Sequence, residues 1–286
     1  MFTLECTKIE DAIGADVLNL DIRQPLTVEM RDALLKAWGE FLVLRFRAQP
    51  MTDPQLIAFS KNLGELEPPG PNPQGKPYLT DFPELNVISN IKQNGQAIGG
   101  LGDGEAIWHA DMTYANSVPM GAVLHGIEVP ISGGNTFWSN LYMAYDTLPS
   151  ELKKTIDGRK AVHDSTYNSA GIMRIGMQPV TDVRHAPGAH HPLVVQHPRN
   201  GKPLLFIGRR RNSYIVGLPV DESEAILDAL WAHASQPQFS MRQEWQMGDT
   251  IVWDNFATIH RRDSFDPNSR RLMHRAQIKG AIPVAA

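Results

Sequence analysis

The sequence predicts a mainly β protein with flanking helices, whose core is an antiparallel sandwich or barrel. Short runs rich in β-branched and aromatic residues recur along the second half of the chain, with turn-forming residues between them. Helical spacing is confined to a few segments placed among these runs. The glycine-rich stretch GGLGDGE (99–105) does not lie between a strand and a helix, so a doubly wound nucleotide-binding fold is disfavoured.

The first part of the chain predicts two helices with a strand between them. Apolar residues recur at helical spacing over 27–41, and Thr27 is suited to cap the amino end. The run FLVLRFR (41–47) follows at once and has strand composition. The second helix covers 53–64, with Pro54 in its first turn.

Proline- and glycine-rich segments follow, around one strand candidate, LNVISNI (85–91). Long loops in compact domains often cover binding sites, although they can also be plain surface connections. With no linker or low-complexity tract dividing the chain, we expect one domain over 1–286. We expect its lid or binding loops at about 65–105 and 164–192.

The remainder of the chain predicts many strands and two helices. The helices are expected over 141–156 and 221–234. The strands are expected over 121–130, 134–140, 192–198, 203–208, 239–246, 249–254 and 274–280.

Composition excludes several classes of protein. The chain has 286 residues, 42% of them hydrophobic, which is enough for a core without disulfides, and its single cysteine is Cys6. The net charge of −4 and the mixed charges give no case for nucleic acid or a membrane surface. The sequence shows neither a signal peptide nor an apolar run that could span a bilayer, so we expect a cytoplasmic protein.

The stretch AIWHADMTY (106–114) carries a potential half of a metal site. On a strand, His109 and Asp111 point to the same face. Two histidines and one carboxylate form the facial triad of iron(II) oxygenases, so a second histidine is needed from elsewhere. The alternative is a hydrogen-bonded pair at a sheet edge.

Of the other nine histidines, His260 stands out by its context. It follows GDTIVWDNFATI, in which a turn and a strand lead to a second turn and another extended run. His125 lies in an apolar run and is expected in the core. The adjacent His190 and His191 would point to opposite faces of a strand, so loop or lid roles are expected for them.

Two arginines follow His260 on a predicted strand. With a period of two, Arg271 and Arg275 share a face with Met273. An arginine on a buried strand face is suited to bind both oxygens of a carboxylate, whereas the alternative is a solvated basic strand.

Together these motifs resemble the TauD/TfdA family of iron(II)- and 2-oxoglutarate-dependent dioxygenases. The resemblance rests on five motifs in the same order, and it extends over most of the chain. The motifs are WHAD (108–111), GGNT (133–136), WDN (253–255), His260 and RRLMHR (270–275). It implies a double-stranded β-helix, or jelly-roll, core.

The resemblance also implies a role for each matching residue. His109, Asp111 and His260 would bind iron(II). Arg271 and Thr136 would hold the distal carboxylate of 2-oxoglutarate, and Arg275 would lie near that cosubstrate or an anionic substrate group. With O2, the reaction would hydroxylate an unactivated C–H bond of a small substrate and release succinate and CO2. Asp111 favours hydroxylation, because related halogenases have a small residue there.

Substrate identity is less well indicated. The taurine enzyme of the family has histidines where this chain has Glu67, Pro68 and Pro69, so taurine is disfavoured. Glu105 stands where that enzyme has an asparagine, and it is a candidate to meet a substrate amine; the alternative is that it faces solvent. Arg211 is a candidate to bind the substrate, because it stands with Arg209 and Arg210 where that enzyme has uncharged pocket residues; the alternative is a solvated turn. If one of these arginines points inward with Arg275, an anionic substrate is favoured.

Two other functions remain open at this point. A zinc hydrolase could use the same three ligands, but it leaves Thr136, Arg271 and Arg275 without a role. A non-catalytic metal-binding β-barrel module is the other alternative. We expect small-molecule substrates, no nucleic-acid or membrane partner, and a homo-oligomer, either dimer or tetramer.

Overall fold

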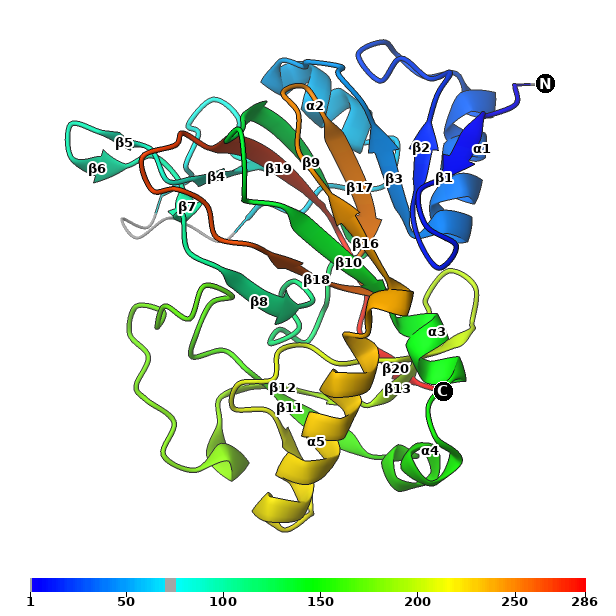
Figure 1. Cartoon of the computed structure of the whole chain (residues 1–286), viewed down its shortest axis with the longest axis vertical. Helices are drawn as coiled ribbons and strands as arrows, with labels where there is room; N and C mark the ends of the chain where they lie inside the picture. The colour runs from blue at the N-terminus through cyan, green and yellow to red at the C-terminus, as the bar shows by residue number, and fades with distance from the viewer. Residues whose placement is uncertain (1, 70–75) are drawn as a thin grey trace.

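Two sheets face each other and form a jelly roll (Figure 1). The structure is a computed structural model that describes residues 2–69 and 76–286. The larger sheet has the strand order β1-β2-β3-β17-β9-β19-β4-β7 and is mostly antiparallel. Its strands are β1 (Cys6–Lys8), β2 (Ala15–Val17), β3 (Val43–Phe46), β4 (Leu85–Ser89), β7 (Gly100–Leu101), β9 (Gly121–Glu128), β17 (Thr250–Asp254) and β19 (Leu272–Ile278).

The smaller sheet has the order β16-β10-β18-β8 and is antiparallel throughout. Its strands are β8 (Ala106–His109), β10 (Thr136–Asn140), β16 (Ser240–Gln243) and β18 (Thr258–Arg262). Trp138 of this sheet packs on Trp253 of the larger one, with ring centroids 5.8 Å apart. Both rings are buried, so the core between the sheets is apolar and closely packed. The predicted mainly β fold is confirmed.

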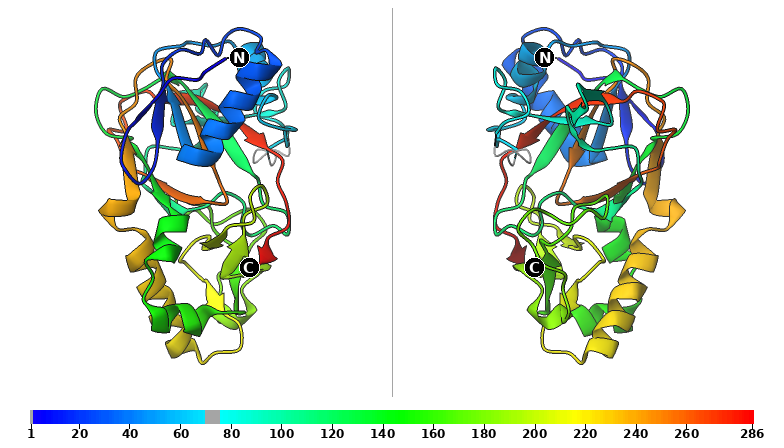
Figure 2. Two further views of the ribbon diagram at one scale, coloured as in Figure 1. Left: turned by 90° about the vertical axis from the view of Figure 1, so that its right-hand side faces the viewer. Right: turned by 90° about the vertical axis from the view of Figure 1, so that its left-hand side faces the viewer.

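Two helices cover the outer face of the larger sheet (Figure 2). The first is α1 (Val28–Phe41), which Thr27 caps by accepting a hydrogen bond from the Met30 amide, as predicted. Its Trp38 is buried in the apolar layer between helix and sheet. The second is α2 (Asp53–Ser60), whose Phe59 ring meets the edge of Phe46 on β3.

A long excursion leaves the smaller sheet after β10 and returns at β16. Figure 1 shows it beyond that sheet, on the side away from α1 and α2. Its helices are α3 (Leu141–Asp146), α4 (Ser150–Ile156), α5 (Val220–Ala234) and the 3-10 turns Val183–His185 and Pro237–Phe239. The single helix predicted over 141–156 is two helices, because Pro149 stands at the amino end of α4 and cannot continue α3.

Small sheets complete the excursion and its surroundings. One has the order β12-β11-β15, another β14-β13-β20, and a hairpin joins β5 to β6. The bounds are β5 (Lys92–Gln93), β6 (Gln96–Ala97), β11 (Lys160–Asp164), β12 (Gly188–Pro192), β13 (Val194–Gln196), β14 (Pro203–Leu205), β15 (Tyr214–Ile215) and β20 (Val284–Ala285).

The predicted loop roles of His190 and His191 are wrong. Both lie on β12, which pairs with β11, so the second predicted lid segment ends in a strand. His191 is buried, and its Nε2 lies 2.9 Å from the carbonyl oxygens of both Thr113 and Ala115. Pairing with β11 thus overrides the loop-like composition. His125 is a core residue as predicted.

The first predicted lid segment is described only in part. Residues 70–75 of the first predicted lid segment lie outside the described residues. Among the helices that the structure describes, none is both long and apolar enough to cross a bilayer.

Candidate active site

The structure brings the three predicted metal ligands together. His109 ends β8, and its cross-strand partner on β18 is His260. Asp111 follows β8 by two residues, and its carboxylate oxygens lie 3.7 Å from His109 Nε2 and 3.9 Å from His260 Nε2. One ligand atom from each residue lies within 4.8 Å of the others, and all three residues are buried. This arrangement suits one divalent cation.

Neighbouring groups fix the orientation of these side chains. His109 Nδ1 lies 2.7 Å from the Ile107 carbonyl oxygen, which leaves Nε2 directed toward Asp111. Asn255, just after β17, accepts a hydrogen bond from the Asp111 amide (2.7 Å) and donates one to the Asp111 carbonyl (3.0 Å). The side chain of Asn255 thus clamps the backbone of Asp111. Asn255 belongs to the WDN motif, and the sequence alone predicted no role for it.

The electrostatics favour the metal-binding protonation state. Burial lowers the pKa of His260 to about 4 and holds that of His109 well below its usual value. Burial opposes ionisation of Asp111, but Arg275, whose Nη1 lies 2.9 Å from Oδ2, and the two histidines outweigh it and lower the pKa of this carboxyl. At neutral pH the site therefore offers two neutral imidazoles and one carboxylate.

Arg271 lines a pocket next to these residues. Its backbone amide donates to Asn90 Oδ1 (3.0 Å), and its carbonyl accepts from the Ser89 hydroxyl (2.7 Å). The side chain is 2% exposed, yet its Nε and Nη1 atoms have no partner among the described residues. An arginine buried with free donors is prepared to receive an anion. Arg275 lines the same pocket, whereas Met273 packs in the core.

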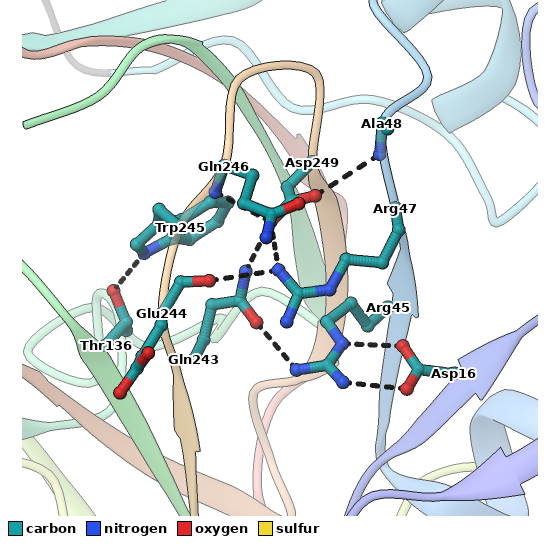
Figure 3. Close-up of polar contacts among 10 residues, drawn as sticks. All are labelled: Asp16, Arg45, Arg47, Ala48, Thr136, Gln243, Glu244, Trp245, Gln246 and Asp249. Atoms are coloured by element: carbon teal, nitrogen blue, oxygen red, sulfur yellow. Dashed lines mark hydrogen bonds and ion pairs between the residues drawn. The ribbon is translucent and has the colours of Figure 1, made fainter. Parts of the chain in front are cut away.

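Thr136, at the start of β10, also lines this pocket. Figure 3 shows Trp245 beside it, and the indole Nε1 donates to Thr136 Oγ1 over 2.9 Å. The hydroxyl proton has no acceptor among the described residues, so it is available to a ligand. The turn that carries Trp245 is held by buried Asp249, which accepts from Gln243 Nε2 (2.8 Å) and the Gln246 amide (2.9 Å).

The two residues predicted only to meet the substrate do not join the ligands. Glu105 is exposed, and its Oε1 lies 4.0 Å from Arg261. Arg211 is exposed too, with its guanidinium 3.4 Å from the centroid of the Tyr167 ring. The inward residue of the triple-arginine segment is Arg209.

Arg209 is 9% exposed and pairs with His109 through a backbone β-bridge. Its Nη1 donates to the Tyr167 carbonyl (2.7 Å), while its Nε has no partner among the described residues. Burial and, secondly, the nearby Arg174 lower the pKa of Arg209 to about 10. Arg210 points outward, toward Glu224 and Asp228.

Comparison with known proteins places these findings in a family. The model of the family described as "Taurine catabolism dioxygenase TauD, TfdA family" matches residues 5–277. The chain belongs to the TauD/TfdA family. The predicted resemblance is confirmed, and membership makes the chain a 2-oxoglutarate-dependent dioxygenase, an oxidoreductase that works with O2 and a divalent metal.

Individual relatives span nearly the whole chain. An alpha-ketoglutarate-dependent 2,4-dichlorophenoxyacetate dioxygenase of Cupriavidus pinatubonensis is 32% identical, covering 92% of this chain and 93% of its own. An alpha-ketoglutarate-dependent sulfate ester dioxygenase of Pseudomonas putida is 28% identical, covering 98% and 91%. The crystal structure of AAD-2 with Mn(II) and N-oxalylglycine is 28% identical, has a TM-score of 0.80, and covers 99% of this chain and 100% of its own.

Proposed function

We propose that this chain uses iron(II) and 2-oxoglutarate to hydroxylate an unactivated C–H bond of a small anionic substrate, with release of succinate and CO2. The observation that carries the proposal is the buried group of His109, Asp111 and His260 beside an unpartnered Arg271. A hydrolytic metal site would need the three ligands but would have no use for a buried carboxylate receptor.

The residues present fit both groups. Two neutral imidazoles and one carboxylate would hold iron(II) and leave coordination positions for the cosubstrate and O2. Arg271 and Thr136 offer donors that have no acceptor among the described residues, as a bound carboxylate requires. When bound, the metal and keto acid supply the oxidising chemistry by activating O2.

The chain's own residues would bind and orient the metal and the keto acid, and they would exclude water from the pocket. Asn255 holds the Asp111 backbone, and the Ile107 carbonyl fixes the His109 ring, so two of the ligands are set before any metal arrives. Trp138 and Trp253 line the pocket and give it an apolar surface beside the ligands. Arg275 holds the Asp111 carboxylate ionised.

An anionic substrate is favoured by the positive side chains around the ligands. Arg209 acts electrostatically on both histidines, and Arg174 lies near it, with its guanidinium 3.8 Å from the centroid of the Tyr114 ring. Neither arginine has an ion-pair partner among the described residues. The relatives named for 2,4-dichlorophenoxyacetate and for sulfate esters act on anions, in agreement with this proposal. We assign substrate recognition to Arg209 in place of Arg211.

The test is an anaerobic visible spectrum of metal-free protein, to which iron(II) and then 2-oxoglutarate are added. We expect a weak charge-transfer band that needs both additions and is absent in His109→Ala. His190→Ala, an exposed histidine on β12, is the matched control and should keep the band. Absence of the band in the wild-type protein, with tight zinc binding instead, would refute the proposal and favour hydrolysis.

If the band forms, succinate release is then measured with a panel of phenoxyalkanoates, alkyl sulfates and their uncharged esters or alcohols. Acceleration by charged members alone supports an anionic substrate. Equal acceleration by charged and uncharged members would contradict that part of the proposal and leave the reaction class intact.

A further inference from the structure

A second buried arginine faces the pocket beside Arg271. Arg262 lies on β18, two residues after His260, and its side chain is among those that line the pocket. Its cross-strand neighbours are Thr136 on β10 and Ala106 on β8. The residue is 5% exposed. The fold therefore places Arg262 between Thr136 and the strand that carries His109.

The two guanidinium groups have free donors and no counter-ion. In each of Arg262 and Arg271, Nε and Nη1 are buried without a partner among the described residues. Neither residue forms an ion pair with a described carboxylate; Asp103 acts on Arg262 only from beyond ion-pair distance. Burying two like charges without a counter-ion is costly, because each loses its hydration and repels the other. A bound anion would remove both penalties.

Arg262 also holds a backbone segment across the pocket. Its Nη2 donates to the carbonyl of Leu101 (3.3 Å) and to that of Gly104. These carbonyls belong to the glycine-rich segment 99–105, and Leu101 lines the pocket. One end of the guanidinium thus fastens the segment. Fastening alone does not account for Nε and Nη1, which stay unpartnered.

We propose that Arg262 binds the distal carboxylate of 2-oxoglutarate together with Arg271 and Thr136, and that this contact couples cosubstrate binding to closure of the 99–105 segment. The inference rests on the proposed function and adds a third protein group to the carboxylate subsite. Planar guanidinium groups on two sides and a hydroxyl donor match the oxygens of one carboxylate. The same side chain links the carboxylate to Leu101 and Gly104.

The experiment compares two keto acids that differ only at the distal end. 2-Oxopentanoate has the keto acid group of 2-oxoglutarate but a methyl group in place of the distal carboxylate. Affinities for both are measured by anaerobic titration of the iron(II) protein, in the wild type and in Arg262→Gln. We expect the variant to bind 2-oxoglutarate about 10- to 100-fold more weakly, with less than about 3-fold change for 2-oxopentanoate, because the charge-assisted contact that it loses is to the distal carboxylate, which 2-oxopentanoate lacks. Equal weakening of both would show that Arg262 only fastens the segment and would overturn the proposal.

Arg261→Gln is the matched control. Arg261 is the next residue on β18 and packs on Phe137, with Nη1 paired to Asp263. It receives the same substitution outside the pocket and should leave both affinities unchanged. If Arg262→Gln does not fold, Arg262→Lys tests the same ratio of the affinities for 2-oxoglutarate and 2-oxopentanoate. Lysine keeps the charge but loses the planar pair of donors.

A measurement on the wild-type protein tests the coupling. Hydrogen exchange of amides in 99–105 should slow by at least about 10-fold with saturating 2-oxoglutarate and stay unchanged with saturating 2-oxopentanoate. Equal protection by both keto acids would overturn the coupling. Absence of a charge-transfer band with 2-oxoglutarate in the wild type would instead refute the proposed function, so the two failures are distinguishable.

Discussion

Replacing Asn255 by leucine should weaken metal binding although Asn255 is not a ligand. The side chain is 1% exposed and makes three hydrogen bonds to backbone groups: with the Asp111 amide (2.7 Å), the Asp111 carbonyl (3.0 Å) and the Pro119 carbonyl (3.1 Å). Leucine has a similar shape, so the substitution removes the hydrogen bonds without opening a large cavity.

The magnitude follows from the groups left unsatisfied. Three buried backbone groups lose their partner, at about 1–3 kcal/mol each, so the free energy of unfolding should fall by about 3 kcal/mol or more. Release of the Asp111 backbone lets its carboxylate leave the orientation that faces both histidines. Loss of an outer-shell contact of this kind typically costs about 10- to 100-fold in metal affinity.

The assay separates affinity from stability. Iron(II) affinity is measured anaerobically by competition with a chelator, and unfolding of the metal-free protein is measured in urea. Asn140→Leu is the control, because buried Asn140 also makes three hydrogen bonds, to Ala12, Tyr142 and Met143, at the opposite end of β10 from Thr136. It should lose similar stability and keep its metal affinity. The reasoning fails if Asn255→Leu is destabilised by the same amount but binds iron(II) like the wild type.

Three other outcomes are expected. Arg271→Ala should weaken 2-oxoglutarate binding by at least about 100-fold, because a charge-assisted bidentate contact is lost, and leave iron(II) affinity unchanged; unchanged keto acid affinity in calorimetry would remove the assigned role. Trp245→Phe should weaken 2-oxoglutarate binding by about 3- to 10-fold, because the Thr136 hydroxyl loses the hydrogen bond from the indole that directs its own proton toward the ligand. Calorimetry that gives the wild-type affinity would contradict this. His163 is buried between His191 and Phe206, and burial lowers its pKa to about 3, so from pH 6.5 toward 3 the unfolded chain binds a proton that the folded chain does not. As the pH falls through that window, the free energy of unfolding should therefore fall by about 1.4 kcal/mol per pH unit. In urea unfolding, His163→Leu should reduce the dependence of this free energy on pH by about one proton. An unaltered dependence would show that the ring is protonated in the folded protein.

The sequence could locate the residues that belong to recognisable motifs. The His109–Asp111 spacing and the order of the later motifs predict one site, and antiparallel pairing of β8 with β18 brings His260 to it. Helical spacing and the capping residue Thr27 likewise predicted where α1 begins. The helix start depends on local spacing, which a single sequence displays. The site depended on the resemblance to a known family, because spacing alone left His109 and Asp111 open to a hydrogen-bonded pair.

Residues whose role depends on cross-strand register were not predictable in this way. Arg262 is placed opposite Thr136 only by the pairing of β10 with β18. Arg209, and not Arg211, points inward, and the backbone of Arg209 pairs with that of His109. Because three consecutive residues are all arginine, the sequence has no alternation of residue types that could show which of them faces inward. His191 sits in a segment of loop-like composition, and only the pairing of β12 with β11 buries it.

We expect the long excursion between β10 and β16 to carry residues that recognise the substrate, apart from the residues that hold the metal and the keto acid. Thr136 and Gln243 are direct cross-strand partners, although the helices α3 to α5 and the strands β11 to β15 lie between them in sequence. The excursion carries Arg174 and Arg209, whereas the metal ligands and Arg271 all lie outside it. With Arg209 in the proposed substrate role, we expect mutations in this segment to change which molecule is oxidised while the strand register that holds the metal stays fixed. We therefore expect that exchange of this segment between relatives changes the substrate and leaves the affinity for iron(II) unchanged.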